Sequence, residues 1–288
     1  MPYTAFRRFA PASYSDGVSL PRGGLVSSSL PSARAVSVAV HQGLKTVQES
    51  SNVSISLMVM QFGQFLDHDL DLTATQSRRC CEPSVLAMDA QQPEELRLCF
   101  NIDLKNDTFY RGKRSCLPFT RSDATCTDSG QREQFNLITA FIDGNNVYGS
   151  DLGRATKLRT KKDGLMRTHT IGPTLPSNGQ TGFAEEEDSS ENLVAGDTRA
   201  TEQPGLASMH SLFLLEHNRI AKEYKRLDPG LSDDQLYNLT RRLVIAELQN
   251  IVYSEFLPVV LGPTIIDDFN LTLPSSGTTI YNSSVDPT

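Results

Sequence analysis

The chain has 288 residues and a formal net charge of −7, with 38% hydrophobic and 21% charged residues. It is long enough to bury the core of one large domain or two small ones, and its composition is typical of a globular protein. The acidic balance argues against nucleic acid as the main partner, and no apolar run is expected to reach the length that spans a membrane.

Several features indicate a secreted protein. The N-terminal segment holds two arginines but no apolar stretch of the kind that a signal peptide needs. The five cysteines all lie between Cys80 and Cys126, and N-x-S/T sequons begin at Asn52, Asn106, Asn238, Asn270 and Asn282. We therefore expect an extracellular protein whose signal peptide is missing from this sequence.

The N-terminal part leads into a strong helix. Residues 1–35 are rich in Pro, Ser, Arg and Gly and predict an extended arm, which is followed by a weak helical pattern over 35–49. A stronger helix is predicted over 56–71, and its expected buried residues are Leu57, Met60, Phe65 and Leu66.

The C-terminal half of this helix is polar. Helical spacing places Gln64, Asp67 and His68 on one face, with Asp69 about 100° further round. One face would then offer an amide, a carboxylate and an imidazole to a ligand, and the neighbouring face a carboxylate to a cation. The alternative is an exposed helix end with solvated acids, and the spacing alone does not decide between the two.

Residues 73–134 are short, polar, turn-rich segments that contain all of the cysteines. Because adjacent cysteines do not easily bridge each other, the simple arithmetic is two bridges to later cysteines with one cysteine left over. We expect the pairs Cys80–Cys99 and Cys81–Cys116, with Cys126 free or bonded to a partner chain. A zinc site is the alternative, but no C-x-x-C pair or nearby histidine supports it.

Oxygen donors are closely spaced over 134–150. Thr139, Asp143 and Asn145 offer side-chain oxygens, and Phe141 adds a main-chain carbonyl. Such hard donors suit Ca²⁺, whereas softer metals prefer Cys or His. The loop is not an EF-hand, because Arg154 occupies the position of the closing glutamate. An Asx-type turn in the D-G-N-N sequence is the alternative.

A further candidate segment follows a predicted surface loop over 158–192. In the sequence A-G-D-T-R-A-T-E-Q-P at 195–204, Arg199 and Glu202 are three residues apart, so one helical turn would project them in the same direction. A structural ion pair between them is the simple alternative to a functional role.

Two long helices are predicted in the C-terminal half. The first spans 206–227 and carries His210 and His217 on its apolar face, where we interpret both as core histidines. The second opens with a Ser-x-x-Gln capping box at 232–235 and runs to about residue 256, before a proline. The rest of the chain is expected to be turn-rich.

Several segments, taken in order, resemble the animal haem peroxidases. They cover nearly the whole chain, and such ordered matches are very specific. The resemblance implies a mainly α-helical peroxidase fold. The matching segments are Y-x-D-G-x-S-L-P-R near the start, Q-F-G-Q-F-L-D-H-D at 61–69, C-L-P-F-T-R-S at 116–122, T-A-F-I-D-G-N-N-V-Y-G-S at 139–150, A-G-D-T-R-A-T-E at 195–202 and S-M-H-S-L-F-L-L-E-H-N-R-I-A at 208–221.

The resemblance implies a haem site with named roles. His68 is similar to the distal histidine, which takes a proton from hydrogen peroxide and returns it to the leaving oxygen. Arg199 is similar to the arginine that stabilises the developing anion. Gln64 is similar to the residue that orients distal water or a halide. Asp67 and Glu202 match the carboxylates that form ester links to haem b in vertebrate members.

The resemblance also implies a Ca²⁺ site. Calcium held there would tie the helix of the catalytic histidine to the 134–150 loop. The residues that match the family's calcium ligands are Asp69, Thr139, Phe141, Asp143 and Asn145.

One expected residue is missing. The family's proximal histidine, the axial ligand of the haem iron, lies well after the R-x-x-E motif, usually in a G-H dipeptide. His217 is the last histidine of this chain, and it and His210 match a helix whose histidines are not iron ligands. We therefore expect residues 1–288 to be a partial peroxidase domain, incomplete at both ends, that holds the distal half of the haem site.

The expected function is reduction of hydrogen peroxide with oxidation of a halide, phenolic or tyrosyl donor, in response to oxidative stress or in matrix or defence chemistry. The expected partners are the peroxide, a small electron donor and a cell-surface or matrix component. The alternatives are an adhesion or matrix module of the peroxinectin type and a truncated, non-catalytic product. The sequence contains no K-G-D or R-G-D tripeptide, which weakens the adhesion alternative.

Overall fold

The chain falls into two compact units, one mainly of Ile55–Leu72 with Ile138–Pro287 and the other mainly of Tyr3–Ser54 with Thr73–Leu137. Helices dominate the first unit and short strand pairs the second, so the prediction of a mainly α fold is confirmed. The computed structural model describes residues 3–24, 30–41, 55–76, 78–93, 96–105, 107–126, 130–169, 174–176, 193–274 and 282–284.

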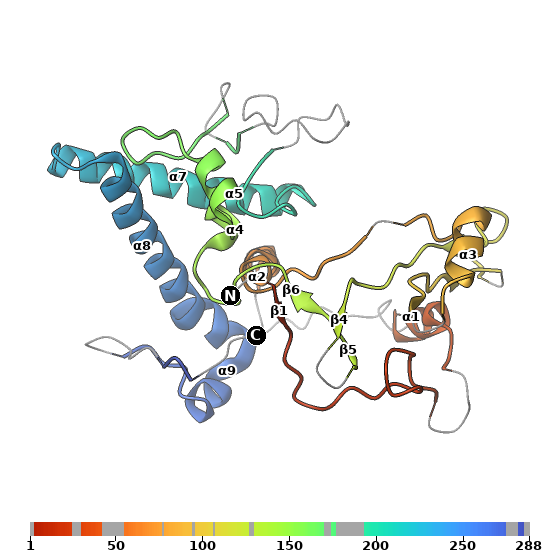
Figure 1. Cartoon of the computed structure of the whole chain (residues 1–288). Coiled ribbons are helices and arrows are strands. Elements are labelled where there is room, and N and C mark those ends of the chain that lie inside the picture. The colour runs from red at the N-terminus through yellow and green to blue at the C-terminus, as the bar shows by residue number, and fades with distance from the viewer. Residues whose placement is uncertain are drawn as a thin grey trace. The chain divides into compact units, whose positions relative to one another are not determined.

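The first unit is built around helix α7 (Pro204–Leu227), which packs against α2 (Leu57–Leu70), α4 (Asn145–Tyr148) and α8 (Asp233–Ile251) (Figure 1). The short helix α5 (Leu152–Leu158) follows α4 and contacts it. Apolar side chains from these helices form one continuous core, because each helix turns one face toward its neighbours. Its members include Phe62, Phe65, Val147, Leu158, Leu206, Phe213, Leu214, Val244 and Leu248.

Local sequence signals set the ends of the two longest helices. Pro204 occupies the first turn of α7, and the Gln203 side chain accepts a hydrogen bond from the Gly205 main-chain N–H at 2.9 Å. Ser232 and Gln235 form the predicted capping box at the start of α8. Both predicted helices are therefore present; α7 begins two residues before its predicted start at 206, and the predicted start of α8 is confirmed.

The predicted end of the second helix was wrong. A π-helical turn (η3, Val252–Phe256) follows α8, and α9 (Leu257–Asp268) continues past Pro258. The wider π turn relaxes the clash between a proline ring and the carbonyl four residues earlier, so the proline does not end the helix. A true break comes at Gly262, whose φ is +77°.

This helical run, Asp233–Asp268, is long and apolar enough to cross a membrane by length and composition alone. Its mean hydropathy reaches 1.3 over the most apolar 18 residues, contrary to the expectation that no run would reach this length. Val244 and Leu248 belong to the hydrophobic core, but only 17% of this 18-residue window is buried. A single helix of this kind is weak evidence for a membrane span.

The second unit contains α1 (Ala33–His41), α3 (Pro83–Ala90) and three antiparallel pairs of two-residue strands. Helix α3 was not predicted; Pro83 at its first turn starts it in a region that otherwise reads as turns. The strand pairs are β1 (Thr4–Ala5) with β6 (Phe135–Asn136), β2 (Ile102–Asp103) with β3 (Cys116–Leu117), and β4 (Thr125–Cys126) with β5 (Arg132–Glu133).

Disulfides Cys80–Cys99 and Cys81–Cys116 cross-link this unit, as predicted. The side chain of Cys126 lies outside the part of the chain that the structure describes. Among the sequons, Asn52 and Asn106 also lie outside it, whereas Asn238, Asn270 and Asn282 are exposed and open to glycosylation.

Buried polar groups of α7 hold the segment that follows α5. His217 lies 2.9 Å from the Gly164 carbonyl through Nε2 and 3.0 Å from the Tyr148 hydroxyl through Nδ1. Asn218 pairs with both the N–H and the C=O of Met166, at 2.8 and 3.0 Å. Gly164 can approach the helices this closely because it has no side chain and adopts a φ of +70°.

We expect Gly164→Ala to lower the free energy of unfolding by about 2–5 kcal/mol, combining positive-φ strain with steric overlap. A Cβ at this position would come within 2.6 Å of the Leu236 Cβ. Gly112→Ala is the matched control, because Gly112 has a φ of +75° but no atom within 4 Å of its Cβ position. Urea titrations followed by circular dichroism would compare them; equal losses would contradict the overlap.

Candidate active site

Helix α2 carries the first group of candidate residues. Its buried face is formed by Phe62, Phe65, His68 and Asp69. Leu57 and Met60 were predicted to be buried but are 80% and 54% exposed. They lie on the flank of the helix, because the face toward α4 and α7 is the one that includes the two aromatic rings.

The loop before α7 brings Arg199 to the C-terminal end of α2. The Arg199 guanidinium donates through Nη2 to the Asp71 carbonyl at 2.7 Å and to the His68 carbonyl at 3.5 Å. Carbonyls in the last turn of a helix lack partners within the helix, and a cation there also complements the helix dipole. Arg199 therefore caps α2 as well as lying beside the histidine.

Asp197 holds Arg199 in this position. Its carboxylate accepts hydrogen bonds from the Arg199 main-chain N–H at 2.7 Å, from Nε at 3.0 Å and from Nη2 at 2.8 Å. Burial alone would raise the pKa of Asp197, but the hydrogen bonds and charge of Arg199 hold that pKa below its ordinary value. The carboxylate partner of Arg199 is thus Asp197 and not Glu202, the residue of the predicted alternative.

His68 is buried between two carboxylates. Its Nδ1 lies 3.8 Å from Asp197 Oδ1, and its Nε2 lies 4.0 Å from Glu202 Oε2. Burial lowers the pKa of His68, and the positive charge of Arg199 lowers it further, against the opposing effect of the nearby carboxylates. The imidazole is therefore neutral at neutral pH and has a free nitrogen lone pair that can accept a proton.

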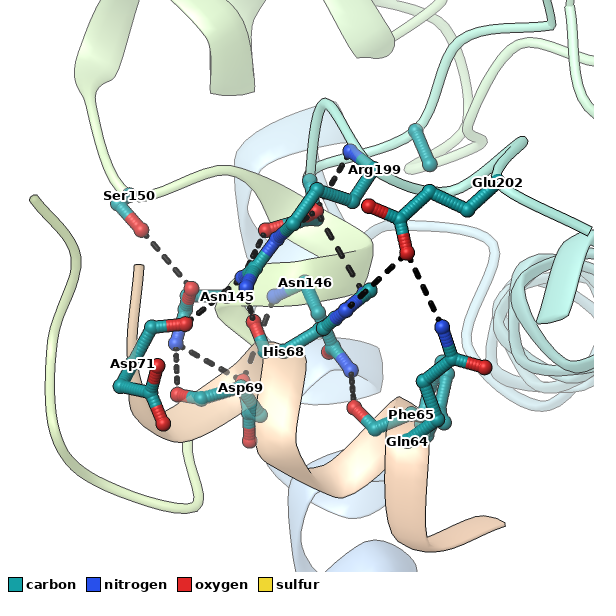
Figure 2. Close-up of polar contacts among 12 residues, drawn as sticks. Gln64, Phe65, His68, Asp69, Asp71, Asn145, Asn146, Ser150, Arg199 and Glu202 are labelled. Carbon is teal, nitrogen blue, oxygen red and sulfur yellow. Dashed lines mark hydrogen bonds and ion pairs between the residues drawn. The ribbon is translucent and has the colours of Figure 1, made fainter. Parts of the chain in front are cut away.

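Gln64 and Glu202 line the more open side of the histidine. The Gln64 amide donates to Glu202 Oε2 at 3.1 Å (Figure 2). It also accepts from Gln203 Nε2 at 3.1 Å. The Glu202 side chain remains 51% exposed. Asp67 is exposed and lies beside Asp71, where burial first and the Asp67 charge second raise the pKa of Asp71 to about 6.

The predicted oxygen-rich loop meets α2 at Asp69. The buried Asp69 carboxylate accepts from the main-chain N–H of Gly144 at 3.1 Å and of Asn146 at 3.3 Å. Burial and the nearby negative charge of Asp143 raise the pKa of Asp69 to about 7. Two carboxylates this close are costly when both are ionised, unless a cation lies between them.

The donor set around Asn145 fits such a cation. The Asn145 amide nitrogen lies between 2.5 and 3.4 Å from five oxygens, which belong to Asp69, Thr139 and Asp143 (Figure 2 labels Asn145 and Asp69). An amide has only two hydrogens to donate, so it cannot satisfy all five. Five oxygens around one point are the environment that Ca²⁺ binds. The described residues contain no cluster of three or more His, Cys, Asp or Glu that could hold a metal. The oxygens around Asn145 do not form such a cluster, because several of them are hydroxyl or main-chain carbonyl oxygens.

The loop also contains the alternative Asx-type turn. The Asn145 N–H donates to Asp143 Oδ1 at 3.1 Å, and the Asp143 N–H donates to the Phe141 carbonyl at 2.8 Å. Asp143 also accepts from the Thr139 hydroxyl at 3.0 Å. The turn and a cation site are therefore compatible, since the turn brings the side-chain oxygens of Thr139 and Asp143 close together.

The sequence prediction missed three residues of this site. Asp197 lies two residues before Arg199, and its local side-chain bond to the Arg199 N–H is typical of an aspartate turn, which could have identified it. Asn146 donates to the Phe65 carbonyl at 2.7 Å and Ser150 donates to Asn145 Oδ1 at 2.9 Å (Figure 2). Local sequence carries no signal for the Asn146 contact, which joins positions far apart in the chain.

The two histidines of α7 are core residues, as predicted. His210 and His217 are both 0% exposed. Burial lowers the pKa of His210 to about 3 and that of His217 to about 4, so both are neutral. His210 packs edge-on against Phe65, with ring centroids 5.0 Å apart.

The chain is similar to known proteins over most of its length. The family model described as animal haem peroxidase matches residues 1–288. Myeloperoxidase of Mus musculus is 38% identical over 98% of this chain and 41% of its own length, and peroxidasin of Drosophila melanogaster is 36% identical over 90% of this chain and 18% of its own. The chain thus spans less than half of these relatives.

A solved structure has a similar fold. Peroxidase A from Dictyostelium discoideum superposes with a TM-score of 0.68 at 24% identity, over 89% of this chain and 49% of that protein. At this level of identity the likeness bears on the fold alone. Together with the family match over the full sequence, it leads to one conclusion: the chain belongs to the animal haem peroxidase family.

Proposed function

We propose that the protein is a peroxidase that reduces hydrogen peroxide at a haem group and oxidises a halide, phenolic or tyrosyl donor. One observation carries the proposal: His68, a buried and neutral imidazole, lies beside a guanidinium whose position is fixed by a buried carboxylate. A neutral base next to a fixed positive charge is what peroxide cleavage requires.

The residues around His68 fit a haem group. The buried part of the site supplies the imidazole and the guanidinium, and its exposed edge supplies the carboxylates of Asp67 and Glu202, which are accessible for ester links to haem methyl groups. Haem, when bound, supplies the redox-active iron at which the O–O bond breaks.

No histidine of α7 suits the role of iron ligand. Both ring nitrogens of His217 already have partners, Tyr148 and Gly164, and His210 is fully buried in the core. We therefore propose that the chain is part of a larger peroxidase domain and that another segment supplies the proximal ligand.

His68 moves the proton in the proposed reaction. Its unprotonated nitrogen accepts a proton from one oxygen of hydrogen peroxide and returns it to the other, which leaves as water. Arg199 stabilises the negative charge that develops as the bond breaks. Gln64, whose amide is held at both ends by Glu202 and Gln203, orients water or a halide beside the histidine.

Calcium binding is the second part of the proposal. Asp69, Thr139 and Asp143 would hold the ion through side-chain oxygens, and Phe141 would add its carbonyl. Asn145 would join them with its amide flipped, because its Oδ1 accepts from Ser150 in this structure. The support is the crowding of oxygens around the Asn145 amide and the costly proximity of two carboxylates. Because Asp69 follows His68 directly, the ion would fix the helix turn that carries the catalytic imidazole.

An extracellular location is also proposed. Two disulfides cross-link the second unit, and such bonds persist in oxidising compartments. The exposed sequons at Asn238, Asn270 and Asn282 are compatible with passage through the secretory pathway.

In the haem-loaded, full-length protein, we expect His68→Ala or Arg199→Ala to lower kcat/KM for hydrogen peroxide by about 10²–10⁴-fold, through loss of the proton acceptor or of the stabilising charge. Stopped-flow absorption would measure the rate. His41→Ala and Arg219→Ala are matched controls, because both side chains are exposed and lie outside the site. A rate for either site variant that equals the controls would refute the assignment.

We expect removal of calcium by a chelator to lower the midpoint of thermal unfolding by about 5–10 °C, since the ion stabilises only the folded state. Scanning calorimetry with and without added Ca²⁺ would show the difference. Asp143→Asn should abolish the response, whereas Asp268→Asn, which removes an exposed acid, should retain it. A midpoint that is insensitive to both chelator and Ca²⁺ would exclude the site.

A further inference from the structure

We propose that Asp197 is a positioning residue that holds Arg199 and also fixes the tautomer of His68, so that the proton-accepting nitrogen is Nε2. The inference rests on the proposed peroxidase function for its consequence, but its structural part stands independently. It follows from the contacts of one buried carboxylate with two catalytic side chains.

Asp197 is a buried carboxylate held by a positive charge. Its side chain is 0% exposed and receives three hydrogen bonds from Arg199, all between 2.7 and 3.0 Å. Its own main-chain N–H donates to the Asn146 carbonyl at 2.9 Å, and Asn146 in turn donates to the Phe65 carbonyl on α2. The carboxylate is therefore held at a defined distance from the helix that carries His68.

Gly196 allows the loop that carries Asp197 to lie close to the backbone of α4. A Cβ at Gly196 would lie 2.4 Å from the Asn145 carbonyl oxygen and 2.5 Å from the Gly149 nitrogen. Any larger residue would push the loop away from α4, and Asp197 with it. The backbone thus supports the position of the carboxylate.

The imidazole of His68 has an unsatisfied nitrogen on the side of Asp197. Within the described part of the chain, His68 Nδ1 is buried without a hydrogen-bond partner, and the carboxylate oxygen lies 3.8 Å away. A bare lone pair on Nδ1 would face a negative charge in a low-dielectric interior, which is repulsive. With a proton on Nδ1 the same contact becomes attractive, so Asp197 favours the Nδ1–H tautomer.

Glu202 has less effect than Asp197 on which ring nitrogen of His68 carries the proton. It lies at a similar distance from the other nitrogen, 4.0 Å from Nε2, but its side chain is 51% exposed. Water screens an exposed carboxylate far more than a buried one, so Asp197 has the larger effect of the two carboxylates on the imidazole. Nε2 therefore keeps its lone pair and faces the open side of the site, where Gln64 and Glu202 lie.

The tautomer can be tested by nitrogen NMR of histidine-labelled chain at mildly alkaline pH, with His68→Gln to assign the signal. We expect the wild-type protein to show Nδ1–H and an unprotonated Nε2. Arg199→Lys, which keeps a positive charge beside Asp197, should retain this tautomer. The double variant Asp197→Asn/Arg199→Gln should lose it, giving Nε2–H or a mixture.

The double variant is more suitable than Asp197→Asn alone, because it is less disruptive to the fold. Removing only one member of a buried ion pair leaves an uncompensated charge, whereas removing both leaves a neutral pair of similar shape. Asp71→Asn is the charge-matched control, because it removes a nearby carboxylate that does not face the imidazole, and its tautomer should match the wild type. Retention of Nδ1–H in the double variant, or Nε2–H in the wild type, would overturn the proposal.

Activity separates this inference from the proposed function. In the haem-loaded, full-length protein, Asp197→Asn should lower kcat/KM for hydrogen peroxide roughly 100-fold, as expected when a catalytic histidine loses the partner that orients it. If the tautomer changes as expected but the wild-type protein shows no peroxide turnover, the peroxidase proposal fails and the positioning role of Asp197 stands. If Asp197→Asn leaves both the rate and the His68 tautomer unchanged, the positioning role of Asp197 is refuted and the peroxidase proposal stands.

Discussion

The geometry of the site depends on two buried carboxylates at the C-terminal end of α2. Asp69, on the helix itself, accepts hydrogen bonds from the N–H groups that begin α4, and Asp197 anchors the arginine that caps the helix. Burying an ionised group costs several kcal/mol, roughly, unless hydrogen bonds and an opposite charge offset it. Asp197 has both in Arg199, whereas Asp69 has the hydrogen bonds but faces Asp143, and a cation would supply the missing charge.

In this arrangement, the residues that hold the site in place are buried, and the residues that a ligand can reach are more exposed. The groups that would fix the proposed catalytic geometry, Asp197 and Asn146, are buried, where a low dielectric strengthens their contacts. The groups that would meet substrate and cofactor, Gln64, Asp67 and Glu202, lie at the more exposed edge. His68 connects the two regions, because one ring nitrogen faces the buried acid and the other faces the open side.

The second unit achieves stability in a different way. Its described strands are only two residues long, so the strand pairs themselves bury little surface. The two disulfides join cysteines 19 and 35 residues apart and restrict the unfolded chain, which favours the folded state without a large core. The adjacent cysteines Cys80 and Cys81 place both links at one point of the chain, so α3 and the strand pair β2–β3 are tied to the same short segment.

The sequence by itself determined the features that depend on neighbouring residues: the apolar period of α7, the capping box of α8 and the motifs around His68 and Arg199. It also predicted the pairing of the cysteines. Only the tertiary structure decided which face of α2 is buried and that Arg199 caps this helix. Periodicity is a local property, so the sequence specifies it directly. Contacts such as that between Arg199 and Asp71, 128 residues apart, depend on how separate segments pack, and no local pattern encodes them.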